Sequence, residues 1–162
     1  MVEHRARILR FAGASIVVAF VYAASQAVIP FVGHFTFVLA FFLGTFASTA
    51  TVGAVAETEH DSLSRRVMVG VAATTFVYAL SWWFWTGLVL WMNDAEIGWL
   101  DLLNPFTFFA VIAALYDQGA WRWGLAGTPV HGGMLAVCWL GEAAIVYGAG
   151  VWAALKHTGD VD

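Results

Sequence analysis

The sequence predicts an all-α protein, a bundle of four transmembrane helices with one extra interfacial helix between the third and fourth spans. Three observations predict this fold class. Hydrophobic residues make up 61% of the 162 residues and charged residues only 11%, against about 25% charged residues in an average soluble domain. Four apolar stretches reach the length of about 20 residues that a helix needs to cross a bilayer. A soluble chain this short also buries only a limited fraction of its surface, so the apolar excess is expected to face lipid.

The four predicted spans belong to a single domain and are separated by turn-forming or charged residues. The first ends at Pro30, the second ends before an acidic segment, and charged or polar residues bound the third and fourth. Two charged residues fall within these stretches, Arg10 near the entrance of the first and Glu142 inside the fourth. The spans cover residues 8–29, 33–56, 67–91 and 133–155.

The first stretch also resembles a secretory signal peptide, because arginines precede an apolar run and Ser25-Gln26-Ala27 loosely fits a cleavage site. Its apolar run is, however, long enough to cross the membrane. We therefore expect it to be a retained first helix.

Within the long third connection, the sequence predicts a helix over residues 105–118. Asn104 can cap it, Pro105 suits its first position, and Gly119 suits its end. This helix is too short to span the bilayer. We expect it to lie in the outer interface or to cap the bundle, either filling space or serving as a lid or docking surface.

Basic residues predict the orientation, because cytoplasmic loops are enriched in Lys and Arg. With a cytoplasmic N-terminus, Arg122 is the one basic residue of the outer segments. The tryptophans agree with this orientation, since they gather near the predicted outer interface, as amphipathic rings do. We expect a multi-pass protein of a bacterial inner membrane with both termini in the cytoplasm. The inner basic residues are Arg5, Arg7, Arg10, Arg65, Arg66 and Lys156, and the outer tryptophans are Trp85, Trp91, Trp99, Trp121 and Trp123.

Small residues at helical spacing predict where the spans pack, because membrane helices associate through close contact of small side chains. Span two carries Ala40 and Gly44 in one such stripe, and span four carries Gly141 and Gly148 in another. Span three instead shows a polar and aromatic stripe that includes Thr74, Tyr78, Ser81 and Trp85, and its Tyr78 and Trp85 are expected to seek hydrogen-bond partners inside the bundle.

Glu142 is the most informative residue, because it lies at mid-depth in span four. A charged side chain at the centre of a membrane helix costs at least about 2.5–3.5 kcal/mol, so the carboxyl must be neutral, hydrogen-bonded or facing water. The candidate partners are Thr74, Tyr78 and Ser81 on span three, or Thr45 and Thr49 on span two. The acid serves either as a structural hydrogen-bond donor or as a functional group.

The glycines of span four lie almost opposite Glu142 on the helix. We therefore expect this helix to contact its own bundle on one side. A second subunit, another membrane protein or a wet cavity would cover the other side.

Four residues near the outer interface could form a metal or catalytic site: His34, His131, Asp101 and Asp117. Their spacing carries no local signature, such as two histidines four apart on a helix. The lone Cys138 excludes a disulfide framework, and no nucleophile motif is present. The net charge of −4 gives no basic field for nucleic acid. The sequence thus predicts no cofactor, no metal and no enzyme activity.

Several segments resemble a family of small bacterial four-span membrane proteins to which no activity is attached. They are Pro30-Phe-Val-Gly-His-Phe, Leu102-Leu-Asn-Pro, Gly119-Ala-Trp, Pro129-Val-His-Gly-Gly-Met-Leu and Trp139-Leu-Gly-Glu-Ala-Ala-Ile. The last is the most specific, because it places Glu142 shortly after a tryptophan. The resemblance implies a four-span topology and emphasises the Glu142 segment, without implying a function.

Three functions remain open from the sequence, and the weakest is a membrane enzyme with its site at the outer surface, under the helix over residues 106–115. The favoured one is a non-enzymatic bundle that assembles with itself or with another membrane protein in the lipid bilayer. The alternative is a small proton- or solute-handling transporter or channel, working as an oligomer with Glu142 in its path; transporters usually show internal repeats, and none is evident here.

Overall fold

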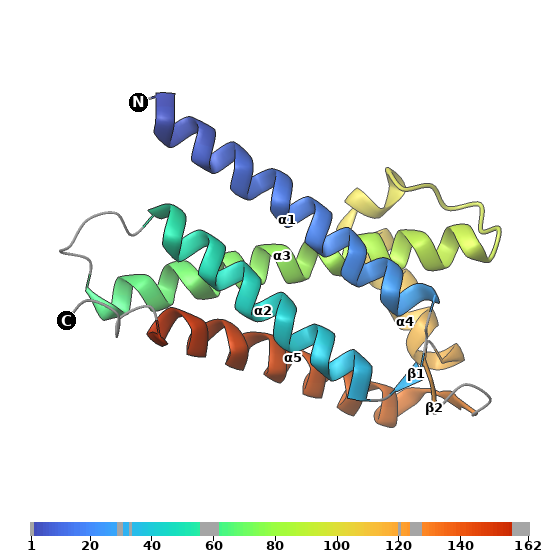
Figure 1. The fold of residues 1–162 in the computed structure, drawn as a ribbon. Helices are drawn as coiled ribbons and strands as arrows, with labels where there is room; N and C mark the ends of the chain where they lie inside the picture. The colour runs from blue at the N-terminus through green and yellow to red at the C-terminus, as the bar shows by residue number, and fades with distance from the viewer. Residues whose placement is uncertain are drawn as a thin grey trace.

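A computed structural model describes residues 2–28, 31–32, 34–55, 62–119, 121–123 and 128–156. Five α-helices dominate it (Figure 1), and they are packed as a bundle. They are α1 (Val2–Val28), α2 (His34–Val55), α3 (Leu63–Met92), α4 (Pro105–Gln118) and α5 (Gly132–Lys156), joined by a 3-10 turn at Asp101–Leu103 and by strands β1 (Phe31–Val32), β2 (Trp121–Trp123) and β3 (Pro129–Val130).

The predicted all-α class and the position of every predicted helix are confirmed. Helix α4 has the predicted bounds, and α5 extends the predicted span by one residue at each end. Helices α1 and α3 begin earlier than the apolar stretches do. At α3 the reason is a cap, because the Ser62 hydroxyl accepts a hydrogen bond from the Arg65 amide at 3.4 Å. The predicted turn at Pro30 and the acidic segment 57–61 lie outside the described residues.

Among the described residues, three helical segments are long and apolar enough to cross a membrane: Leu9–Val28, Leu63–Met92 and Gly132–Lys156. The apolar segment Thr36–Thr51 of α2 is shorter. The chain therefore has the helix lengths and hydropathy of a multi-pass membrane protein.

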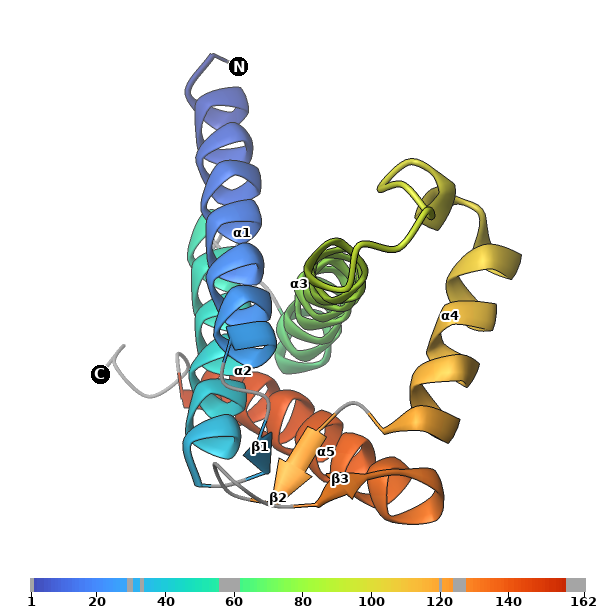
Figure 2. The same cartoon turned by 90° about the vertical axis from the view of Figure 1, so that its right-hand side faces the viewer.

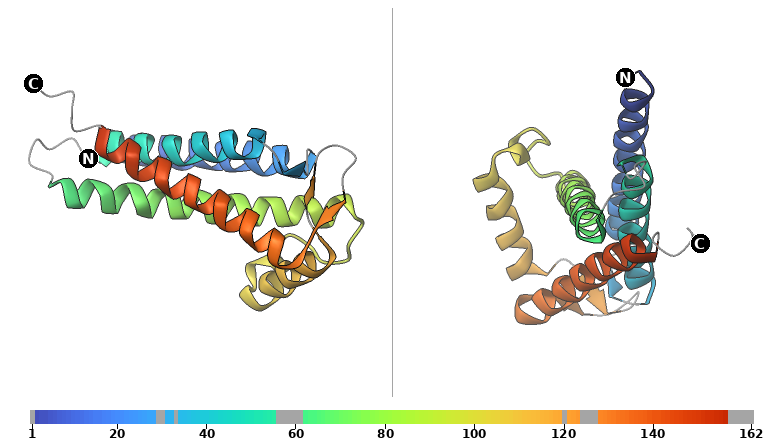
Figure 3. Two further views of the ribbon diagram at one scale, coloured as in Figure 1. Left: turned by 90° about the horizontal axis from the view of Figure 1, so that it is seen from below. Right: turned by 90° about the vertical axis from the view of Figure 1, so that its left-hand side faces the viewer.

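Helices α1, α2, α3 and α5 lie side by side, whereas α4 lies across the direction of α3 (Figures 1 and 2). The main contacts of α5 are with α2 and α3, and those of α1 are with α3 and α2. The start of α1 and the end of α5 lie at one end of the bundle, and α4 and the strands lie at the other (Figure 3). Between α2 and α5 the backbones are in close contact, because a Cβ added at Gly44 would lie 2.0 Å from the Val146 carbonyl oxygen.

A small three-stranded sheet, in the order β1-β2-β3, was not predicted. Strand β1 pairs in parallel with β2, and β2 pairs antiparallel with β3. Strands of two or three residues are too short to show an alternating pattern in the sequence. The sheet ties the α1–α2 connection to the segment that precedes α5.

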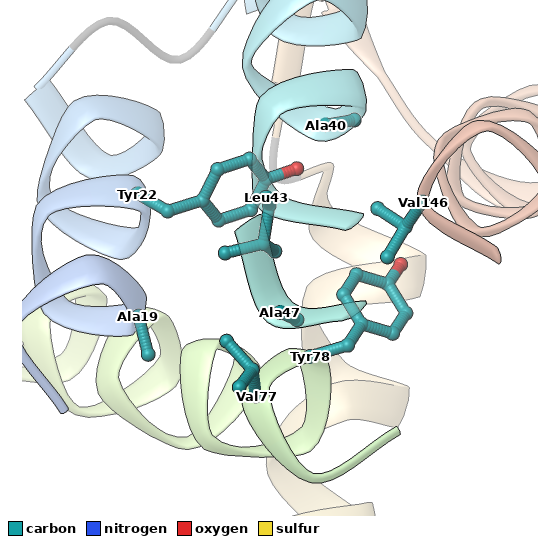
Figure 4. Packing of buried hydrophobic residues seen from close by; sticks show 8 residues of the cluster. All are labelled: Ala19, Tyr22, Ala40, Leu43, Ala47, Val77, Tyr78 and Val146. Carbon is teal, nitrogen blue, oxygen red and sulfur yellow. The ribbon is translucent and has the colours of Figure 1, made fainter. Parts of the chain in front are cut away.

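The core is made of alanine, branched aliphatic and tyrosine side chains from all four long helices. Tyr22 projects from α1 and Tyr78 from α3 into the space between the helices (Figure 4). Ala40 is fully buried on α2. The cluster comprises Ala19, Tyr22, Ala40, Leu43, Ala47, Val77, Tyr78 and Val146.

The glycines of α5 pack differently from the predicted stripe. No described atom lies within 4 Å of a Cβ built at Gly148, so this residue takes no part in the packing among the described residues. A Cβ at Gly141 would make an ordinary contact of 3.8 Å with the Phe37 ring. The close contact belongs instead to Gly150, where a Cβ would lie 2.5 Å from Thr74 Oγ1. The packed face of α5 is therefore the face that carries Glu142.

Candidate functional site

The Glu142 carboxyl lies inside the helix bundle. Its side chain is only 3% exposed, and Cys138, Ala149 and Ala153 on the same face of α5 are also buried. Tyr22 of α1 donates its hydroxyl hydrogen to Glu142 Oε1. A buried acid that is removed from water requires such a partner. Because α5 packs mainly on α2 and α3, this bond links two helices on different sides of the bundle.

Tyr22 was not among the partners expected from the sequence. Of those partners, Ser81 lies beside Glu142 in the same cavity, and its hydroxyl donates to the Tyr78 carbonyl at 2.7 Å. Tyr78 is buried in the core next to Val146. Thr74 lies against Gly150, about two turns further along α5, and Thr45 donates to its own helix at the Phe41 carbonyl at 2.9 Å. The partner could have been found from the one tyrosine inside span one, but only if that helix was known to face span four.

A cavity of about 20 Å³ adjoins the carboxyl. A polar cavity larger than about 10–15 Å³ can hold one water molecule. Of the described residues that line it, none carries a positive charge. The lining consists of Tyr22, Gln26, Ser81, Trp82, Trp85, Trp139 and Glu142.

Two indole N–H groups of this lining are buried and have no hydrogen-bond partner in the described part of the chain: Trp85 Nε1 and Trp139 Nε1. They come from α3 and α5, respectively. The Gln26 side-chain amide of α1 lies within hydrogen-bonding reach of the Tyr22 hydroxyl. Buried donors are nearly always paired in folded proteins, either with protein groups or with ordered water. The two indoles therefore leave hydrogen-bonding capacity unused beside the cavity.

Trp85 was expected near the outer end of its span and also on the stripe that faces the bundle interior. Its side chain is only 5% exposed and packs inside the bundle, as the stripe predicted. Its depth in the membrane stays a prediction. Trp91, by contrast, is exposed.

The aromatic rings form a rigid frame around the cavity. The Trp82 ring meets Trp85 edge-on at a centroid distance of 5.4 Å and Trp139 at 5.1 Å. It also meets Tyr78 at 6.2 Å. Edge-to-face pairs at these distances are favourable and hold ring orientations.

Tyr22 also lines an apolar groove of about 350 Å³ between α1 and α2. The groove is bordered by exposed side chains such as Val17, Val21 and Phe42. In a bilayer these side chains face lipid. Tyr22 thus separates a lipid-facing groove from the polar cavity.

Of the four outer-interface candidates, the described Asp101 and Asp117 lie apart. His131, Asp101 and Asp117 are exposed, and the His34 side chain lies outside the described ones. Asp101 Oδ2 accepts a hydrogen bond from the Gly98 amide at 2.9 Å. Asp101 and Asp117 lie near opposite ends of α4, whose 14 residues span about 20 Å. Among the described residues, no group of three His, Cys, Asp or Glu side chains could hold a metal ion.

Comparisons with protein-family models, curated proteins and solved structures find no match for this chain. No family is therefore identified by them.

Proposed function

We propose that this protein is a four-span membrane protein that handles protons through Glu142. The observation that supports this function best is the buried Glu142 carboxyl, hydrogen-bonded to Tyr22 and adjoining a polar, water-sized cavity. Intramembrane ionisable residues that face a bundle interior commonly mark ion or proton pathways. The proposal assigns no chemical reaction to the protein.

The fourth crossing in this proposal is α2. The whole helix has 22 residues, so it spans about 33 Å, which matches a hydrocarbon core of about 30 Å. It packs against both α5 and α3, which are long enough to cross. With four crossings, the start of α1 and the end of α5 lie on the same side, and the basic residues favour the cytoplasmic side for both.

The size of the cavity favours a proton over a larger solute. A space of about 20 Å³ accommodates one water molecule and no metabolite. The neutral hydrogen-bond donors around it can stabilise a carboxylate without a basic partner. A carboxyl in such surroundings can both release and accept a proton.

The alternative is a non-enzymatic bundle that assembles with itself or with another membrane protein. It is favoured by the outward face of α5, where Gly133 and Gly148 have open space beside them. Small residues on a lipid-facing surface allow close approach of another helix. In this alternative, the bond between Tyr22 and Glu142 is a brace between α1 and α5.

Proton flux in liposomes tests the proposal. We expect wild-type protein to conduct protons above the level of empty liposomes, and Glu142→Gln to lose at least about 90% of that flux, because glutamine keeps the size and hydrogen bonding but cannot titrate. Tyr147→Phe is the matched control, since the Tyr147 hydroxyl bonds Thr75 at 3.1 Å on an exposed surface. It should conduct like the wild type.

Equal flux in the wild type and Glu142→Gln would contradict the proposal. Absence of flux in all three proteins would also contradict it and would favour the assembly function.

A further inference from the structure

The cavity beside Glu142 has a donor arrangement that the proposed function does not by itself explain. Trp85 of α3 lines the cavity and is more than nine-tenths buried, and its indole N–H has no hydrogen-bond partner among the described residues. Trp139 of α5 also lines the cavity, and its indole N–H lacks a partner in the same way. Gln26 of α1 adds a side-chain amide, which lies within hydrogen-bonding reach of the Tyr22 hydroxyl. Among the described residues of the lining, Glu142 carries the one carboxyl.

We infer that this cavity is a binding site for a single ordered water molecule that connects the indole N–H groups to Glu142. A water molecule can accept two hydrogen bonds and donate two. Accepting from Trp85 and Trp139 would satisfy both buried indoles, and its own hydrogens would be free to bond the carboxyl and a second acceptor. Buried waters typically make about three hydrogen bonds to groups that lack protein partners.

The chemistry of the lining selects water over ions. The lining is rich in N–H donors and offers few of the oxygen ligands that a cation requires, which disfavours a cation. The carboxyl of Glu142, when ionised, disfavours an anion. The volume of about 20 Å³ excludes a larger neutral ligand.

This inference rests on the proposed function and deepens it. A neutral Glu142 can donate its hydrogen to the water, and an ionised Glu142 can accept a hydrogen from it. The indoles hold the water in place in both states. Trp85 and Trp139 are therefore positioning residues, acting on the acid through the bound water.

Infrared spectroscopy of the protein in lipid nanodiscs tests the site directly. In H₂¹⁸O, we expect a water O–H stretching band of the wild type to move to lower frequency. Trp139→Phe and Trp85→Phe should each remove or shift this band and also shift the carboxyl C=O band that Glu142→Gln identifies. Trp152→Phe is the control on α5, the helix that carries Trp139, because the Trp152 ring is partly exposed and contacts Phe41 and Lys156. It should leave both bands unchanged.

Gln26→Leu provides an independent variant in case loss of an indole unfolds the bundle; it should also shift the water band. Absence of an ¹⁸O-sensitive water band in the wild type would overturn the inference, as would a band unchanged in Trp85→Phe, Trp139→Phe and Gln26→Leu. If the wild type shows the ¹⁸O-sensitive band but Glu142→Gln does not change the proton flux, the water site stands and the proton-handling function is contradicted.

Discussion

Gly44→Ala is expected to destabilise the bundle by about 3 kcal/mol, at the upper end of the usual cost of overpacking. The added Cβ would lie 2.0 Å from the Val146 carbonyl oxygen and 2.8 Å from its carbonyl carbon. These are backbone atoms, so the strain cannot be relieved by a side-chain rotation, and α2 and α5 must move apart. The better helix propensity of alanine, about 1 kcal/mol, offsets only part of this cost. Unfolding by SDS in mixed micelles measures the change.

Gly148→Ala is the matched control, because it adds the same methyl group to α5 where no described atom lies within 4 Å. It should leave the unfolding free energy unchanged or raise it slightly. Equal destabilisation by both substitutions would contradict the close approach of the α2 and α5 backbones at Gly44.

Cysteine labelling in intact cells should give an all-or-none difference between the two ends of α3. Ser64 lies in the first turn of α3 and Glu96 lies four residues after its end, and both are exposed. With the orientation that the basic residues predict, a membrane-impermeant maleimide added outside should label Glu96→Cys and not Ser64→Cys.

The wild type controls this experiment, since its single cysteine, Cys138, is buried and should remain unlabelled. Ser64→Cys must become labelled once the membrane is opened with detergent. Labelling of Ser64→Cys alone in intact cells would show that the orientation is opposite to the predicted one. Labelling of both would contradict the crossing by α3.

The sequence was sufficient to predict the helices, because long apolar runs and local caps determine them. Asn104, Pro105 and Gly119 gave the bounds of α4, and the structure has Asn104 Oδ1 accepting from the Phe106 amide at 3.0 Å. Glu142 could likewise be singled out from its depth alone. Both predictions depend on residues that are neighbours in the sequence.

Features that depend on how the helices are arranged could not be predicted in the same way. The bond from Tyr22 to Glu142 joins residues 120 positions apart, and no periodicity within either helix reveals it. Trp85 was placed both near the outer interface and on an inward stripe, because depth along a helix does not tell which way a ring turns. Gly150 packs and Gly148 does not, although they are two residues apart on one helix, because only one of them faces Thr74.

The central claim is that Glu142 is turned into its own bundle and bonded to Tyr22. A double-mutant cycle with Tyr22→Phe and Glu142→Gln, measured by unfolding in a lipid environment, tests it most directly. We expect a coupling free energy of about 1–2 kcal/mol, near the upper end for hydrogen bonds between membrane helices. The control cycle of Glu142→Gln with Tyr147→Phe should be additive, because the Tyr147 hydroxyl bonds Thr75 instead. A coupling free energy near zero between Tyr22 and Glu142 would contradict the hydrogen bond between them.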